Sequence, residues 1–268
     1  MMTEKLKDHS VVEEIWHDFL LTGGFEDERR KRRFFKLFPG SQRCKTCYAP
    51  FQGTGGKLVK ILYQKRPSNL NPYLCNTCED FARINLGGTE IELSLLFADV
   101  RGSTTLAESM SAFEFHKLIN RFYSTATQVM VNSDALIDKI IGDQVAGIYV
   151  PGFAGEQHAS RAIEAAQNIL KATGHGEKDG PWIPLGVGVH TGITFMGSVG
   201  SASGTSDITV LGDSANTAAR LSTSAEIGEI LISDSAYQHA EYKSSKLLEQ
   251  RELSLKGKSS KMLVHVLA

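Results

Sequence analysis

Apolar residues recur along the first 38 residues with the spacing of an amphipathic helix. They follow the i, i+3, i+4, i+7, i+8 rule of one helix face: Val12, Ile15, Trp16, Phe19 and Leu20. Gly23 and Gly24 would end this helix, and the next segment, EDERRKRRFFKLF, is predicted as a second helix closed by Pro39-Gly40. We interpret the basic run Arg29–Arg33 as a solvated helix face, the usual role of such a run.

The pattern changes after residue 88, where short apolar runs alternate with helical stretches. Strands are predicted at 91–98, 136–141, 145–150, 184–190, 207–211, 229–232 and 262–267. Helices are predicted between them, at 105–131, 155–173 and 214–224. The order strand, long helix, two close strands, helix, strand predicts an α+β fold of the ferredoxin-like kind. Its central sheet would be mostly antiparallel, flanked by helices and extended at its end.

These patterns divide the chain into three predicted domains. Residues 1–40 form a small helical segment, residues 41–80 are rich in Gly, Pro, Asn and Tyr, and residues 88–268 form the large α+β domain. A chain of 268 residues has room for one sizeable domain and a small one.

All four cysteines lie in the middle domain, in the motifs CKTC and CNTC: Cys44, Cys47, Cys75 and Cys78. Two CxxC knuckles suit a tetrahedral Zn²⁺ ion, which takes four thiolates and stabilises a segment too small for its own core. We therefore predict a zinc-knuckle-like module. An Fe–S cluster or a redox-active disulfide pair is the alternative.

Composition and net charge argue against a nucleic-acid-binding protein and against a membrane protein. Hydrophobic residues make up 41% of the chain, charged residues 22%, and the net charge is −1. This balance gives no overall attraction to nucleic acid or to a membrane, and the knuckles have few basic neighbours. The sequence shows neither an apolar run of about 20 residues nor a signal peptide. We expect a cytoplasmic protein with no membrane span and no nucleic-acid partner.

Two aspartates stand at predicted strand ends. The apolar run before Asp99 stops abruptly there, and Asp143 follows Gly142 in what reads as a tight hairpin turn. Each aspartate alone is as readily a turn or cap residue. If the two strands are neighbours, however, the carboxylates can share one or two hard cations such as Mg²⁺, with phosphate oxygens completing the shell.

The turn after Asp99 consists of small and polar residues. Arg101, Gly102, Ser103 and Thr104 lead into a helix, and their backbone N–H groups are expected to suit a polyphosphate. A second loop before a helix, TVLGDSANTAARL, carries Asn216 and Arg220 at i and i+4, so both project from one face. The planar, positively charged guanidinium group of Arg220 can donate two hydrogen bonds to phosphate oxygens. Considered alone, Arg220 is more simply explained as an exposed residue on an amphipathic helix.

The motifs FADVRGST, DKIIGD, GVHTG, TVLGDSANTAARL and LKGK occur in the order and spacing of the class III nucleotidyl cyclases. The resemblance covers about residues 88–268. It implies a homodimer in which two subunits pair head to tail and each active site is shared across the interface. It also implies two Mg²⁺ or Mn²⁺ ions per site, held by Asp99, Asp143 and the backbone carbonyl of Val100.

The resemblance assigns further residues. Asn216 and Arg220 match the positions that hold the ribose and stabilise the transition state, and Lys256 matches a lysine that contacts the triphosphate. Lys139 and Thr209 match the positions that read the purine. A lysine can only donate, to adenine N1, and a threonine hydroxyl can accept from the adenine amine. The expected reaction is therefore the conversion of ATP to 3′,5′-cyclic AMP and pyrophosphate.

Two alternative functions remain open, and one residue of the chain differs from the family pattern. Guanylate cyclases of the family carry an acidic residue at the position of Lys139, so GTP is disfavoured as substrate. An inactive, cyclase-like dimerisation module is disfavoured because the metal aspartates and the Asn/Arg pair are all present.

Many relatives have an arginine where this chain has Gly186, so phosphate affinity would depend more on Lys256 and Arg101. His190 is interpreted as a strand residue with a structural partner, not a base.

Overall fold

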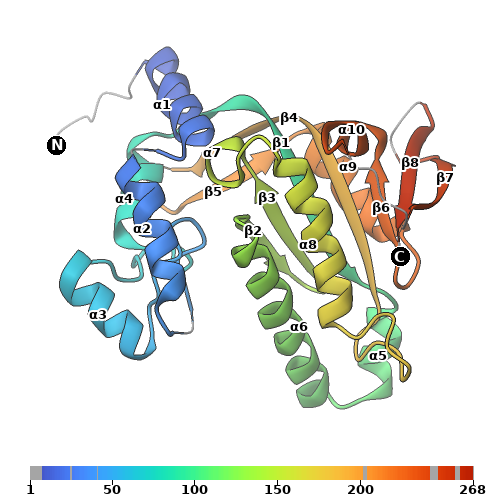
Figure 1. Ribbon diagram of the computed structural model, residues 1–268. Helices are drawn as coiled ribbons and strands as arrows, with labels where there is room; N and C mark the ends of the chain where they lie inside the picture. The colour runs from blue at the N-terminus through green and yellow to red at the C-terminus, as the bar shows by residue number, and fades with distance from the viewer. Residues whose placement is uncertain are drawn as a thin grey trace. The chain divides into compact units, whose positions relative to one another are not determined.

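The computed structural model describes residues 8–24, 26–40, 42–201, 204–241, 247–256 and 260–267 (Figure 1). Its contacts divide the chain into two compact units. The first unit comprises residues 1–91 and 194–211, and the second comprises residues 92–193 and 212–268. Residues 194–211 therefore group with the N-terminal part of the chain, a division that differs from the three consecutive domains read from the sequence.

The first unit contains four described helices: α1 (His9–Thr22), α2 (Glu26–Leu37), α3 (Gly53–Tyr63) and α4 (Asn76–Ile84). The predicted amphipathic stripe of α1 is confirmed, because Val12, Trp16 and Leu20 are buried. The Asp8 side chain accepts from the Ser10 N–H at the start of α1, and Gly23 ends the helix in the left-handed region. Helices α3 and α4, within the cysteine-containing segment, were not predicted.

Aromatic contacts and one buried arginine hold the helices of the first unit. The Trp16 ring packs edge-on against Phe81 with ring centroids 5.1 Å apart, and its Nε1 donates to the Asn85 carbonyl over 2.8 Å. Arg32 is only 3% exposed: it donates to the Tyr48 hydroxyl and lies 4.2 Å above the Tyr48 ring. The interpretation of Arg29–Arg33 as a solvated face is therefore wrong for Arg32, whose cation stacks on an aromatic ring.

The main sheet has the strand order β2-β3-β1-β4-β6-β8-β7, with β5 paired to β4. Its strands are β1 (Gly87–Val100), β2 (Leu136–Ile141), β3 (Gln144–Tyr149), β4 (Leu185–Gly200), β5 (Ser206–Leu211), β6 (Ile230–Ser233), β7 (Leu247–Leu253) and β8 (Met262–Leu267). The order β2-β3-β1-β4, with β1 and β2 antiparallel to β3, is that of a ferredoxin-like sandwich. The predicted α+β fold is confirmed. Strand β7 is an addition that the sequence pattern did not reveal.

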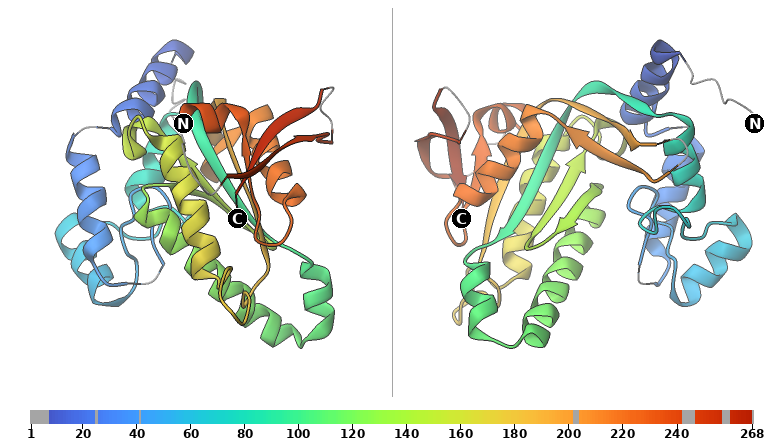
Figure 2. Two further views of the ribbon diagram at one scale, coloured as in Figure 1. Left: turned by 45° about the vertical axis from the view of Figure 1, so that its right-hand side comes forward. Right: turned by 180° about the vertical axis from the view of Figure 1, so that it is seen from behind.

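The second unit contains six described helices. They are α5 (Ser103–Ser109), α6 (Ala112–Asn132), α7 (Pro151–Ala154), α8 (His158–Ala172), α9 (Asp213–Ser224) and α10 (Asp234–His239). Helices α6 and α8 lie side by side on one face of β1 and β3, and the view from behind shows the strands in front of them (Figures 1 and 2). Side chains of both helices form the main core with the sheet. Among the helices of the described residues, none is long and apolar enough to cross a membrane.

The sequence predicted one helix over 105–131, and the structure has two. Ser111 explains the break, because its side chain accepts from the Glu114 N–H while the Glu114 carboxylate accepts from the Ser111 N–H. This reciprocal capping box starts a new helix and ends the preceding one at Ser109.

Candidate active site

The two predicted metal aspartates lie on neighbouring strand ends. Gly142 adopts the left-handed region, with φ 63°, and closes the two-residue turn between β2 and β3. Strand β3 pairs with β1 so that Gln144 is opposite Asp99, and the Val100 N–H donates to the Asp143 carbonyl over 3.0 Å. The hairpin therefore brings the Asp143 backbone beside the end of β1, which is the condition for the two carboxylates to share a cation.

The chemistry of this pair suits a hard divalent cation. Asp99 is only 8% exposed, and burial, with the negative charge of Asp143 second, raises the pKa of its carboxyl group above the usual range. Arg101 lies 3.2 Å from the Asp99 carboxylate and opposes this shift. A cation beside Asp99 and Asp143 would offset the negative charges of their carboxylates, and oxygen ligands are those that Mg²⁺ prefers.

Three further residues support the carboxylates. The Gln144 side-chain amide donates to Asp99 over 3.3 Å and to the Ser222 hydroxyl of α9 over 3.2 Å. Ser103 donates to the Asp143 carboxylate, and the Tyr123 hydroxyl of α6 donates to the Gly142 carbonyl. Sequence reasoning proposed Ser103 for phosphate binding and missed Gln144 and Tyr123. Gln144 directly follows Asp143 in the sequence, but its position opposite Asp99 comes from the pairing of β1 with β3, which the hairpin pattern does not specify.

Helix α9 approaches β4 unusually closely, because two glycines face it. A Cβ atom on Gly188 would lie 2.4 Å from the Ser222 nitrogen, and one on Gly186 would lie 2.9 Å from the Ser222 and Ala225 carbonyl oxygens. The backbone thus leaves no room for a side chain at Gly186. Any larger residue there would have to shift α9, which carries Asn216 and Arg220.

Asn216 and Arg220 lie one turn apart on α9, away from its buried face. Asn216 is exposed and Arg220 half-buried, whereas Thr217, Ala218 and Leu221 are buried. The His190 ring on β4 makes a 2.8 Å hydrogen bond to the Ser233 hydroxyl. That contact confirms the expected structural partner of His190.

The remaining predicted substrate residues lie at separate points of the chain. Lys139 is on β2, paired with Ala146, and only its backbone is described. Lys256 is exposed in the turn after β7, and the residues that follow it in LKGK lie outside the described range. Gly102 adopts the left-handed region, with φ 65°, at the start of α5, and Thr104 is exposed within that helix. Thr209 is buried on β5, in the first unit.

The four cysteines, all within the described chain, converge on one point as free thiols. Their Sγ atoms lie within 4.8 Å of one another, and those of Cys47 and Cys75 are 3.7 Å apart. Four sulfurs bound to one Zn²⁺ at about 2.3 Å would be separated by about 3.8 Å. Hydrogen bonds from the other three thiols, aided by Lys65, lower the pKa of Cys75, which favours a thiolate there. The donor set fits a tetrahedral metal ion.

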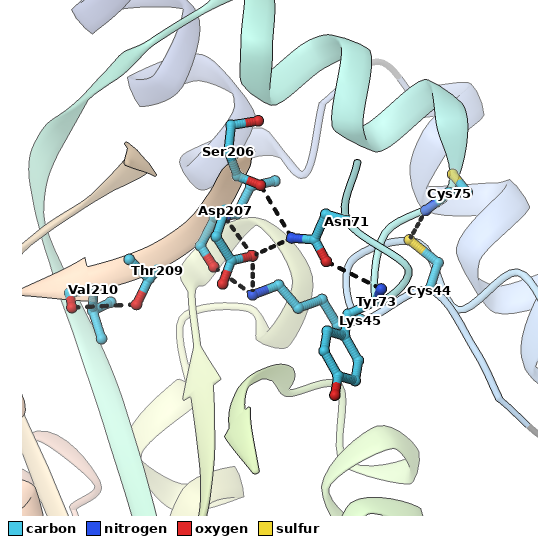
Figure 3. Close-up of polar contacts among 10 residues, drawn as sticks. Cys44, Lys45, Asn71, Tyr73, Cys75, Ser206, Asp207, Thr209 and Val210 are labelled. Atoms are coloured by element: carbon cyan, nitrogen blue, oxygen red, sulfur yellow. Dashed lines mark hydrogen bonds and ion pairs between the residues drawn. The ribbon is translucent and has the colours of Figure 1, made fainter. Parts of the chain in front are cut away.

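The cysteine-containing segment contacts β5 within the first unit (Figure 3). Lys45, inside the CKTC turn, donates to the Ile208 carbonyl over 2.9 Å and forms a 2.5 Å ion pair with Asp207. Asn71 donates to the Ser206 carbonyl over 3.0 Å and to the Asp207 carboxylate over 3.1 Å. All of these contacts fall on the residues of β5 that directly precede Thr209.

Comparisons with known proteins identify the class of domain to which the ferredoxin-like sheet belongs. The family described as "Adenylate and Guanylate cyclase catalytic domain" matches residues 89–268. The chain belongs to this family, the class III nucleotidyl cyclases.

Relatives of both substrate types are similar to this chain. An adenylate cyclase of Anabaena cylindrica is 28% identical over 181 residues, which are 65% of this chain and 36% of the relative. Guanylate cyclase 32E of Drosophila melanogaster is 30% identical over 173 residues, 62% of this chain and 14% of the relative. The chain therefore spans only a minor part of these longer proteins.

Solved structures show the same fold. The guanylyl cyclase Cya2 superposes with a TM-score of 0.61 at 21% identity, covering 68% of this chain and 94% of that one. The adenylyl cyclase CyaB from P. aeruginosa superposes with a TM-score of 0.58 at 24% identity, covering 68% and 96%. Cyclases named for either nucleotide share the architecture, so the choice of base depends on individual residues.

Proposed function

We propose that this protein is an adenylate cyclase that converts ATP to 3′,5′-cyclic AMP and pyrophosphate. The observation that carries the proposal is the carboxylate pair, with Asp99 and the Asp143 turn on neighbouring strand ends and the pKa of Asp99 raised. Asp99, Asp143 and the Val100 carbonyl would hold two Mg²⁺ or Mn²⁺ ions. Such ions, when bound, ease deprotonation of the ribose 3′-hydroxyl and neutralise the triphosphate.

The chain's own residues would orient the substrate and stabilise charge. The ribose 3′-oxygen forms a bond to the α-phosphorus, the bond to the bridging oxygen of pyrophosphate breaks, and the 3′ proton passes to water. Arg220 stabilises the charge that builds on the α-phosphoryl oxygens. Asn216 fixes the ribose, because an error of about 1 Å in the attacking atom can cost around 100-fold in rate.

The triphosphate would be held by cationic and small residues around the carboxylates. Arg101 already lies beside Asp99, and the turn through Gly102, Ser103 and Thr104 has no bulky side chain to block close approach. Lys256 supplies a flexible cation from the turn after β7. A guanylate cyclase and an inactive dimerisation module are the alternatives, and the assay below separates them.

The preference for ATP depends on hydrogen-bond polarity at Lys139 and Thr209. Adenine presents an acceptor at N1 and a donor at its amine, which match a lysine donor and a hydroxyl acceptor. Guanine reverses both. Purified full-length protein should therefore make cyclic AMP from ATP, and little cyclic GMP from GTP, when assayed with Mg²⁺ or Mn²⁺. Cyclic GMP as the main product would overturn the adenylate assignment, and no cyclic product would favour the inactive module.

Exchanging the two base-reading residues should reverse this preference. In Lys139→Glu/Thr209→Cys, the carboxylate accepts from guanine and the thiol is a poor acceptor for the adenine amine. We expect the ratio of kcat/KM for ATP to that for GTP to fall by about 10² or more, because mismatched buried donors and acceptors are strongly rejected. An unchanged ratio in a folded variant would contradict the assignment of both residues.

We also propose that the four-cysteine segment positions the base-reading strand, through Lys45 and Asp207. The Lys45 side chain is 10% exposed. Its amino group contacts Asp207 and Ile208, the two residues of β5 directly before Thr209. Lys45→Met should raise KM for ATP by roughly fivefold with a smaller change in kcat, since one partly exposed ion pair contributes about 1 kcal/mol. Lys57→Met, at an exposed position of α3, is the matched control. Equal KM values for the two variants would contradict this role.

A further inference from the structure

A second cluster of metal-ligating side chains lies in the second unit, separate from the cysteines and from the aspartate pair. It comprises Glu92 on β1, His158 at the first residue of α8 and His239 at the last residue of α10. One ligand atom of each lies within 4.8 Å of the ligand atoms of the other two. Three different elements thus bring two imidazoles and one carboxylate together.

The inner member of the cluster is oriented by a buried hydrogen-bond chain. His158 is 3% exposed, and its Nδ1 is 2.8 Å from the Ser94 hydroxyl, which is 2.6 Å from the Thr191 hydroxyl. When Nδ1–H donates to Ser94, the unprotonated nitrogen is Nε2, which is free to act as a ligand. Metal-binding histidines are commonly fixed in this way through their second nitrogen.

The outer members are accessible and already close to a metal-binding separation. Their side chains are 50% exposed for Glu92 and 34% exposed for His239, so an ion can enter from solvent. The Glu92 carboxylate oxygen lies 3.3 Å from Nδ1 of His239. Two ligands bound to one Zn²⁺ at about 2.0 Å are separated by about 3.3 Å. Small rotations of the exposed side chains toward His158 would complete a three-ligand set.

We propose that Glu92, His158 and His239 form a binding site for a divalent transition-metal ion, Zn²⁺ being the best match. Two imidazoles and a carboxylate are borderline ligands that suit Zn²⁺ and leave its fourth position to water. An ion there would tie the beginning of β1 in the second unit to the start of α8 and the end of α10. The site depends neither on the cyclase activity nor on the metal of the cysteines.

The first test is zinc stoichiometry of the full-length protein, measured with the cysteines intact and Mg²⁺ in excess to occupy oxygen-ligand sites. We expect wild-type protein to bind one more Zn²⁺ per chain than Glu92→Gln or His239→Gln. Both substitutions are at exposed positions, so the fold should survive. His116→Gln, an exposed histidine of α6, is the matched control and should retain the additional ion. Equal stoichiometry in wild type and both variants would overturn the proposal.

A second measurement tests the orienting role of Ser94. Ser94→Ala should weaken the additional site by about 10- to 100-fold in Kd without removing a ligand, since it deletes only the hydrogen-bond partner of His158.

A third measurement uses Co²⁺ as the probe. Co²⁺ should give d–d absorption at this site without a thiolate-to-cobalt charge-transfer band. If all additional cobalt shows thiolate charge transfer, or if Zn²⁺ fails to raise the thermal midpoint of wild type above that of His239→Gln, Glu92 and His239 form only an ion pair.

Discussion

Two inactive variants, Asp99→Ala and Arg220→Ala, should recover activity when their subunits are mixed. Each variant alone should lose roughly 10²–10³-fold in kcat, because one lacks a metal ligand and the other the charge-stabilising guanidinium. If each site takes Asp99 from one subunit and Arg220 from the other, a mixed dimer has one complete site and one doubly damaged site. The heterodimer should therefore have about half of wild-type activity, and a random mixture in equal amounts about a quarter.

The measurement uses two affinity tags, so that heterodimers are isolated and verified before cyclic AMP is quantified. Differently tagged Asp99→Ala subunits mixed with each other should stay inactive. Asp179→Ala, at an exposed carboxylate between α8 and β4, controls for loss of charge and should remain active. A verified Asp99→Ala/Arg220→Ala heterodimer without activity would contradict sites shared across a homodimer.

We propose that the four cysteines hold a structural metal ion, whose removal should unfold much of the first unit. The small core around them contains few large apolar side chains, and the cysteines themselves belong to it: Phe35, Cys44, Cys47, Ala49, Val59, Leu74 and Cys75. A core of this size cannot offset the conformational entropy that the segment loses on folding unless a metal ion cross-links it. Structural zinc contributes about 10–16 kcal/mol in zinc-finger peptides, so its loss should be the largest stability effect in the molecule.

Metal analysis, visible absorption and limited proteolysis would measure this effect. Purified protein should contain zinc at the cysteines, whereas iron, sulfide and visible colour would identify an Fe–S cluster instead. Cys75→Ser should lose that metal and become sensitive to proteolysis between residues 42 and 85. Thr54→Ser, exposed on α3, should do neither. Full metal content and protease resistance in Cys75→Ser would contradict a structural metal site.

Local signals were sufficient to predict the centre of the candidate site. Gly142-Asp143 between two apolar runs predicted a hairpin, and β2, β3 and their turn lie where the pattern put them. Strand β1 ends beside that turn because its register sets Gln144 opposite Asp99. Periodicity likewise located α8 and α9 to within a few residues, since both helices bury one continuous face.

Other features depend on contacts that no short pattern contains. The capping box at Ser111 divided a helix whose apolar period continues across the break. Arg32 is buried because Tyr48 supplies a ring and a hydroxyl from the next segment, which the charge run does not reveal. Strand β7 pairs with β8 in an order that periodicity does not specify. The contacts of Lys45 and Asn71 with β5 join residues more than 130 positions apart, and no local pattern predicts them.

That last contact bears on how such a protein can be cut, fused or recombined. The first unit is not a contiguous stretch, because residues 194–211 complete it from within the cyclase domain. A single cut near residue 88 would therefore separate β5 from Lys45 and Asn71, its hydrogen-bonding neighbours. A chimera that exchanges the whole first unit would need three crossovers, near residues 91, 194 and 211. If a foreign domain replaces the N-terminal region through a single junction, β5, which carries Thr209, should lose its native contacts with Lys45 and Asn71.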